Sequence, residues 1–164
     1  MSPRSVLFLC YGNPGRLDDS LGAAFARELE GRNPAGVAIE VDYQLAVEDA
    51  LTISQHETVI FVDAAVNGPE PFSFRRVEPS RGMSFTSHSV QPGRLLGLAE
   101  ELFGSTASAY ALGIRGYQFD AFGETLSEGA ERNLAAALEF MTTMLRNGAF
   151  DRGAQVFGDA PQPC

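Results

Sequence analysis

Two short apolar segments constrain the fold of this chain more than any other feature. Residues 6–10 and residues 59–62 are runs of apolar side chains with no polar residue inside them. A strand with one face in water alternates between apolar and polar residues, whereas a strand covered by helices on both faces does not. These two segments therefore predict central strands, over 5–11 and 58–64, of a mostly parallel sheet.

The rest of the chain supplies helices and further strands around these two. Apolar residues at helical spacing predict helices that cover, in order, residues 20–30, 48–54, 92–103 and 127–146. Alternating patterns predict strands over 38–43, 72–77 and 108–114. This order of elements is typical of the α/β class, as a three-layer α/β/α sandwich around a mostly parallel five-stranded sheet.

One strand of the five is expected to run antiparallel. Residues 72–77 follow the third strand through a segment that is too short to cross back over the sheet, as a parallel connection would require. The polar residues in this segment suggest an edge position.

The chain is expected to form a single domain with a short tail. Its 164 residues are enough for one hydrophobic core, which we place in residues 1–150. From residue 151 the composition changes to Asp, Gly, Gln and Pro, so we expect a flexible tail over 151–164.

The charge of the chain argues against two classes of partner. Twelve basic and 21 acidic residues give a net charge of −9, whereas nucleic acids and anionic membranes attract clustered basic residues. The first apolar run is far shorter than the roughly 20 residues that span a membrane. With only two cysteines, Cys10 and Cys164, a disulfide framework is not expected. We expect a cytoplasmic monomer that binds neither nucleic acid nor membrane.

An acidic pair, Asp18 and Asp19, lies between the first strand and the first helix. Open α/β sheets place their ligands at the carboxyl ends of the strands, so the pair lies where a site is expected. The alternative is that one aspartate caps the N-terminus of the first helix. The two interpretations are compatible, because one residue can cap while the other faces the site.

Asp63 and His88 are candidates to join this pair. Asp63 ends the third strand, and His88 lies in a Ser/Thr/Gly-rich segment before the helix at 92–103. If the first and third strands are neighbours, two carboxylates and one imidazole could meet at one edge, a set that suits Zn²⁺ or Ni²⁺. Each residue also has an ordinary interpretation, the aspartate as a turn former and the histidine as a solvated side chain.

The glycines after the first strand do not form a nucleotide-binding motif. Gly12 and Gly15 are not followed by Gly-Lys-Ser/Thr, and their spacing is not that of a dinucleotide fingerprint. Gly12 and Asn13 are better explained by a tight turn that lets another backbone approach, such as an extended peptide. Cys10 lies in the buried run and is a poor candidate for a nucleophile.

Taken in order, five segments resemble one known family, the maturation proteases of nickel-iron hydrogenases. They are residues 12–22 with the acidic pair, 61–64, 86–88, 112–114 and 123–127. The first segment is moderately specific by itself, and all of them in the same order are strongly specific.

The resemblance covers roughly residues 5–146 and implies a function. It implies a nickel-dependent endopeptidase that removes the C-terminal extension of a hydrogenase large-subunit precursor after the metal has been inserted. By the same resemblance, Asp19, Asp63 and His88 would be both the metal ligands and the catalytic residues. The nickel would arrive with the substrate, and zinc or cadmium could take its place. The sequence names no general base, and capping the first helix is the role expected of Asp18.

Other segments suggest which hydrogenase is served and where the substrate binds. Residues 42–50, 74–76 and 113–117 resemble the subgroup that processes soluble, NAD-linked or bidirectional hydrogenases. Gln44 lies where many relatives have a different sequence, in a region expected to shape the substrate groove. We therefore expect four residues to contact substrate, namely Gly12, Asn13, Asp18 and Gln44.

Two other functions remain open from the sequence. The chain could be a binding module that checks the nickel-loaded precursor without cutting it. It could also be a different metal-dependent hydrolase that acts on a small molecule. A mass loss of the precursor, a stable complex without mass loss, or no interaction would distinguish the three.

Overall fold

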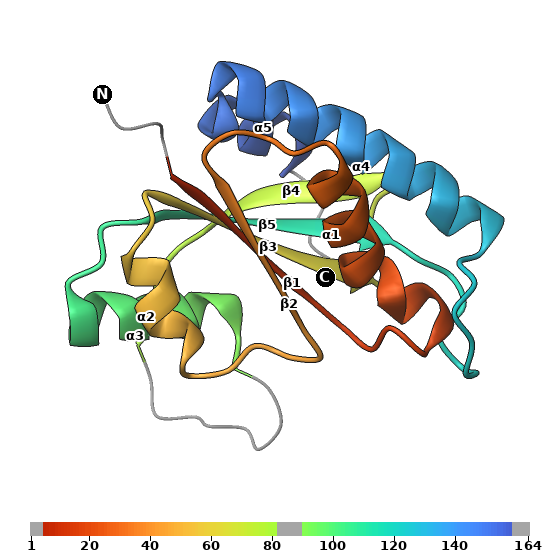
Figure 1. Cartoon of the computed structure of the whole chain (residues 1–164), viewed down its shortest axis with the longest axis horizontal. Helices are drawn as coiled ribbons and strands as arrows, with labels where there is room; N and C mark the ends of the chain where they lie inside the picture. Colours follow the sequence, from red (N-terminus) through yellow and green to blue (C-terminus); the bar gives the residue numbers. More distant parts are fainter. Residues whose placement is uncertain (1–4, 82–89, 159–164) are drawn as a thin grey trace.

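The computed structural model describes residues 5–81 and 90–158, in which five strands form one sheet (Figure 1). The strands are β1 (Val6–Tyr11), β2 (Val37–Asp42), β3 (Thr58–Ala65), β4 (Phe72–Val77) and β5 (Ser108–Arg115). Their order across the sheet is β2-β1-β3-β5-β4, and only β4 pairs antiparallel with its neighbour. The predicted mixed sheet with an antiparallel edge strand is confirmed.

Helices cover both faces of the sheet. They are η1 (Leu17–Ser20), α1 (Leu21–Gly31), α2 (Asp49–Ser54), α3 (Pro92–Phe103), α4 (Glu128–Asn147) and α5 (Phe150–Phe157). Figure 1 shows α1, α4 and α5 on one face, with α2 and α3 on the other. The three-layer α/β/α architecture is therefore as the sequence predicted.

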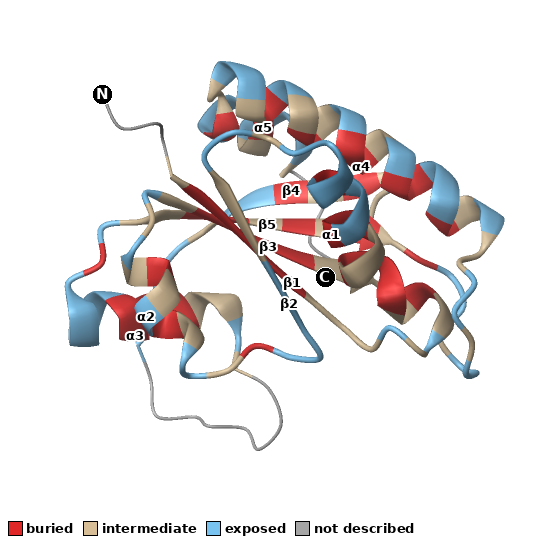
Figure 2. Cartoon of the chain, in the orientation of Figure 1, coloured by how far each residue is buried: buried red, intermediate tan, exposed pale blue. Residues whose placement is uncertain are grey.

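The central strand β1 shows why its apolar run is unbroken. Val6, Phe8 and Cys10 pack in a cluster with side chains of α1 and α4, whereas Leu7 and Leu9 pack in a second cluster with α2 and α3. Successive side chains of a strand point to opposite faces, so a strand between two helical layers needs apolar residues at every position. Figure 2 shows the resulting buried stretch through the middle of the sheet.

Residues next to its two ends fix where α4 begins and ends. The Ser127 hydroxyl accepts a hydrogen bond from the Ala130 amide at 3.2 Å and caps the N-terminus, at the residue where the sequence predicts that this helix begins. Gly148 ends the helix with a φ of 70°, a left-handed conformation that glycine adopts without a steric penalty.

The expected flexible tail is wrong for residues 151–157, which belong to α5. The Phe157 ring packs against Phe72 with 5.0 Å between centroids, and Asp151 accepts a hydrogen bond from Arg76 at 2.7 Å. The polar composition of the segment obscured two aromatic residues, Phe150 and Phe157, that lie two helical turns apart. Residues 159–164 lie outside the described part of the chain.

We find no helix in residues 5–81 and 90–158 that is long and apolar enough to cross a membrane.

Candidate functional site

The candidate site is built at the carboxyl edge of two neighbouring strands. β1 and β3 are parallel, with Cys10 opposite Val62, so the segment after β1 and Asp63 near the end of β3 reach the same edge. Burial is the main cause of the raised pKa of Asp63, and the negative charge of Asp19 adds to it, as expected of two carboxyl groups at one edge. The segment that carries Asp19 and the end of β3 that carries Asp63 therefore lie at the same edge of the sheet.

A tight turn between β1 and η1 positions Asp19. Its Oδ2 accepts a hydrogen bond from the Asn13 amide at 2.9 Å. Gly12 has a φ of 132°, and a Cβ there would lie 2.3 Å from the Asp19 carbonyl oxygen, so only glycine fits. The Gly12 amide also donates to the carbonyls of Asp42 and Tyr43, which joins the turn to the end of β2.

Asp18 has neither of the tasks predicted for it, which were capping the first helix and contacting the substrate. Its side chain is fully buried and accepts four hydrogen bonds, from the amides of Tyr117 (2.8 Å), Gln118 (3.0 Å) and Ser127 (2.8 Å) and from the Ser127 hydroxyl (2.7 Å). It therefore does not cap α1, whose N-cap residue is Ser20 and has no side-chain capping bond. The capping prediction is wrong because the carboxylate turns away from its own helix, toward the segment after β5.

The surroundings of Asp18 favour its ionised form. Burial by itself would raise the pKa, but the hydrogen bonds from Ser127, Tyr117 and Gln118 stabilise the carboxylate and hold the pKa below its usual value. The contacts that hold the Asp18 carboxylate in place are therefore the same ones that stabilise its charged form.

Asp63 is perturbed in the opposite direction. Burial is the main cause that raises its pKa to about 7, and the charge of Asp19 raises it further. The Ala64 amide, which donates a hydrogen bond to Oδ1 at 2.8 Å, acts in the opposite direction and lowers the pKa. A carboxyl group with a pKa near neutrality can exchange a proton under working conditions, which makes Asp63 the group in this site best suited to acid–base or ligand chemistry.

The remaining predicted residues are placed as follows. Gln44 is exposed after β2 and its side chain makes no hydrogen bond within the described part of the chain. Residues 5–81 and 90–158 contain no group of three His, Cys, Asp or Glu side chains arranged to hold a metal, and His88 lies outside these residues. Cys10 is buried, and burial raises the pKa of its thiol, in agreement with the predicted lack of reactivity.

The attachment of the segment after β5 to the turn after β1 is not predicted from the sequence. The Leu17 amide donates to Gly123 at 2.9 Å, the Gly123 amide donates to Gly15 at 2.8 Å, and Arg16 Nε donates to Phe119 at 2.6 Å. These partners are about 100 residues apart in the chain, and spacing carries no signal for such a pairing. Residues 116–127 are therefore part of the site.

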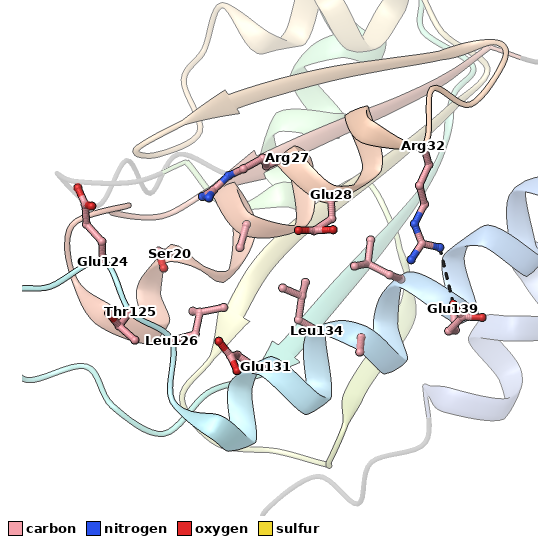
Figure 3. A pocket seen from close by; sticks show the side chains of 13 residues that line it. Ser20, Arg27, Glu28, Arg32, Glu124, Thr125, Leu126, Glu131, Leu134 and Glu139 are labelled. Atoms are coloured by element: carbon pink, nitrogen blue, oxygen red, sulfur yellow. Dashed lines mark ion pairs between the residues drawn. The ribbon is translucent and has the colours of Figure 1, made fainter.

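A separate groove lies between α1 and α4 and does not include Asp19 or Asp63 (Figure 3). It encloses about 510 Å³ and is lined by charged side chains above leucines such as Leu134. An ion pair between Arg32 and Glu139, at 3.8 Å, lies at one end. Since the groove lacks the perturbed carboxyl group, we assign the chemistry to the strand edge.

Comparison with known proteins gives matches at the level of structure. No family model and no curated protein matches this sequence.

Three solved structures resemble the chain over most of its length. A NiFe hydrogenase maturation protease, HycI from Thermococcus kodakarensis KOD1, is 19% identical with a TM-score of 0.67, covering 87% of this chain and 92% of that one. The hydrogenase maturating endopeptidase HybD from E. coli is 20% identical with a TM-score of 0.64, covering 88% and 94%. A hydrogenase 2 maturation peptidase from Thaumarchaeota archaeon SCGC_AB-539-E09 is 20% identical with a TM-score of 0.63, covering 87% and 98%. The chain shares the fold of these proteins.

Proposed function

We propose that this protein is a metal-dependent endopeptidase that removes the C-terminal extension of a nickel-iron hydrogenase large-subunit precursor. The observation that carries the proposal is the interacting pair Asp19 and Asp63 at the carboxyl edge of β1 and β3. The pair lies on a fold shared with solved structures named as hydrogenase maturation proteases.

The donor set fits a nickel ion that arrives with the precursor. Asp19 uses Oδ2 to accept from Asn13, and Asp63 uses Oδ1 to accept from Ala64. Within the described residues the other oxygen of each carboxylate accepts no hydrogen bond, so both can serve as ligands, with His88 as the proposed third. Two carboxylates and an imidazole suit a borderline divalent ion such as Ni²⁺, and Zn²⁺ or Cd²⁺ could replace it.

The residues of this chain have separate tasks in the proposed reaction. A bound ion supplies polarisation of the scissile carbonyl or of a water molecule. Asp63, whose pKa is raised to about 7 in the metal-free site, would give up its proton on binding the ion. Asp18 holds the turn that carries Asp19, while Gly12, Asn13 and the exposed Gln44 are the residues proposed to contact the extended peptide.

The decisive experiment incubates the purified protein with nickel-loaded and with metal-free precursor and measures the mass of the precursor. The proposal expects a mass loss equal to the C-terminal extension, with the loaded form only. The Asp19→Asn and His88→Ala variants should be inactive, whereas Glu57→Gln, which changes an exposed carboxylate just before β3 at the opposite edge of the sheet, should cut at the wild-type rate. A stable complex without mass loss would instead indicate a binding module, and no interaction would leave a small-molecule hydrolase.

We propose the precursor of a soluble, NAD-linked hydrogenase as the substrate. This rests on residues 42–50, 74–76 and 113–117, of which 43–44 follow β2 and 116–117 follow β5 at the site edge. Competition between precursors of NAD-linked and other hydrogenases in one reaction tests it, and preferential cutting of another precursor would contradict it.

A further inference from the structure

Exposed apolar side chains gather at the edge of the sheet that carries the candidate site. Phe122 is the most exposed large apolar residue in the described part of the chain, at 89%. Tyr43, Val66 and Tyr117 are also exposed, and they follow β2, β3 and β5, whose carboxyl ends form this edge. Exposed apolar groups that cluster around a site mark a surface for a macromolecular partner more often than single scattered ones do.

The segment that presents Phe122 is held rigidly. Its neighbour Gly123 makes two backbone hydrogen bonds, from Leu17 at 2.9 Å and to Gly15 at 2.8 Å. Asp18 anchors the start and the end of the same segment through Tyr117 and Ser127. An exposed aromatic ring on a fixed backbone loses little conformational entropy when it is buried by a partner.

Acidic residues lie on either side of Phe122 in the sequence. Asp120 and Glu124 flank Phe122, and both are exposed with no ion pair among the described residues. A partner that buries Phe122 must therefore bring an apolar pocket with basic groups at its rim. The same charges oppose an anionic membrane surface, which would be repelled.

We propose that Phe122, together with Tyr117, Val66 and Tyr43 along the same edge of the sheet, is the docking surface for the folded body of the protein substrate, next to the site that receives its extension. This inference rests on the proposed function, because a protein substrate can reach both the Asp19–Asp63 pair and Phe122. Phe122 is the anchor, entering an apolar pocket on the substrate, and Asp120 and Glu124 contact the basic rim of that pocket.

The test measures kcat and KM for cleavage of the nickel-loaded precursor by Phe122→Ser. Loss of an aromatic anchor should raise KM about tenfold or more and leave kcat and the melting temperature unchanged. The matched control is Phe103→Ser, which removes a half-exposed phenylalanine at the end of α3, in the other helical layer, and should change neither constant. An Asp120→Arg variant should also raise KM.

The outcomes separate this inference from the proposed function. If wild-type protein cuts the precursor and Phe122→Ser has the same KM, the docking surface is wrong and the proposed function stands. If the wild type cuts no precursor, the proposed function fails, and the docking surface is judged by the affinity of each variant for the precursor. Equal affinities of wild type and Phe122→Ser overturn it. A wild-type dimer that Phe122→Ser dissociates, measured by sedimentation, also overturns it, because the occupant is then a second copy.

Discussion

Asp18 and Asp63 lie at the same edge of the sheet, and their surroundings shift their pKa values in opposite directions. Asp18 is fully buried but accepts four hydrogen bonds, and its pKa is held below the usual value. Asp63 is less buried, accepts one hydrogen bond from Ala64 and faces the charge of Asp19, and its pKa rises to about 7.

The contrast shows that the number of donors, rather than the depth of burial, decides what a carboxylate does here. A carboxylate whose oxygens are saturated by amides is a structural anchor, because exchanging those bonds for a ligand would leave amides without acceptors. A carboxylate with an oxygen to spare, such as Asp63, is available for chemistry. Asp19, between the two in the fold, is fixed by one bond to Asn13.

The largest expected effect is the loss of the anchor. Asp18→Ala leaves three backbone amides and the Ser127 hydroxyl without their acceptor, and we expect the free energy of unfolding to fall by about 4 kcal/mol. Urea denaturation followed by circular dichroism measures the change. Asp120→Ala, an exposed control on the same segment, should change it by less than about 0.5 kcal/mol. A loss below about 1 kcal/mol in Asp18→Ala would contradict the anchoring role.

The next effect concerns the pH dependence of the metal-free protein. Because the pKa of Asp63 is higher in the folded state, at about 7, than in the unfolded chain, the folded protein binds this proton more tightly. The stabilisation is complete below about pH 4 and is lost as the pH rises through about 7, with a total change of at most about 4 kcal/mol.

Asp63→Asn keeps an oxygen that can accept from Ala64 but does not titrate. As the pH rises from 4.5 to 8, the unfolding free energy of the wild type should therefore fall relative to that of Asp63→Asn. Denaturation midpoints at several pH values give this difference. A difference that is constant with pH would show that Asp63 titrates normally.

A smaller effect is expected where the anchor meets α4. Ser127→Ala removes one of the four donors to Asp18 together with the cap of α4, and should cost about 1.5 kcal/mol. The backbone amide of residue 127 still donates to Asp18, so the loss is well below that of Asp18→Ala. Thr125→Ala, an exposed neighbour, is the matched control, and equal losses in the two variants would argue against the specific role of Ser127.

The smallest effect is a shift in the titration of Asp63. Asp19→Asn removes a nearby negative charge, so the pKa of Asp63 should fall by a fraction of a pH unit. Carbon-13 NMR of the Asp63 carboxyl group measures it in the metal-free protein. An unchanged midpoint would show that the two carboxyl groups do not interact.

Much of the fold follows from local patterns. The apolar runs at 6–10 and 59–62 predict the buried strands β1 and β3, and Ser127 predicts the start of α4 because capping depends on bonds within one turn. The helix α5 was missed because its stability comes from Phe157 packing on Phe72 and from Asp151 pairing with Arg76, which are contacts with a distant strand.

By itself the sequence determined the layers of this protein and the edge at which Asp19 and Asp63 meet, since strand burial and direction depend on nearby residues. Only the tertiary structure decided the task of Asp18. Its donors, Tyr117 and Ser127, lie 99 and 109 residues away, and only folding brings them to the carboxylate. Two adjacent aspartates with the same chemistry thus become an anchor and a candidate ligand, because hydrogen-bond partners are assigned in space rather than along the chain.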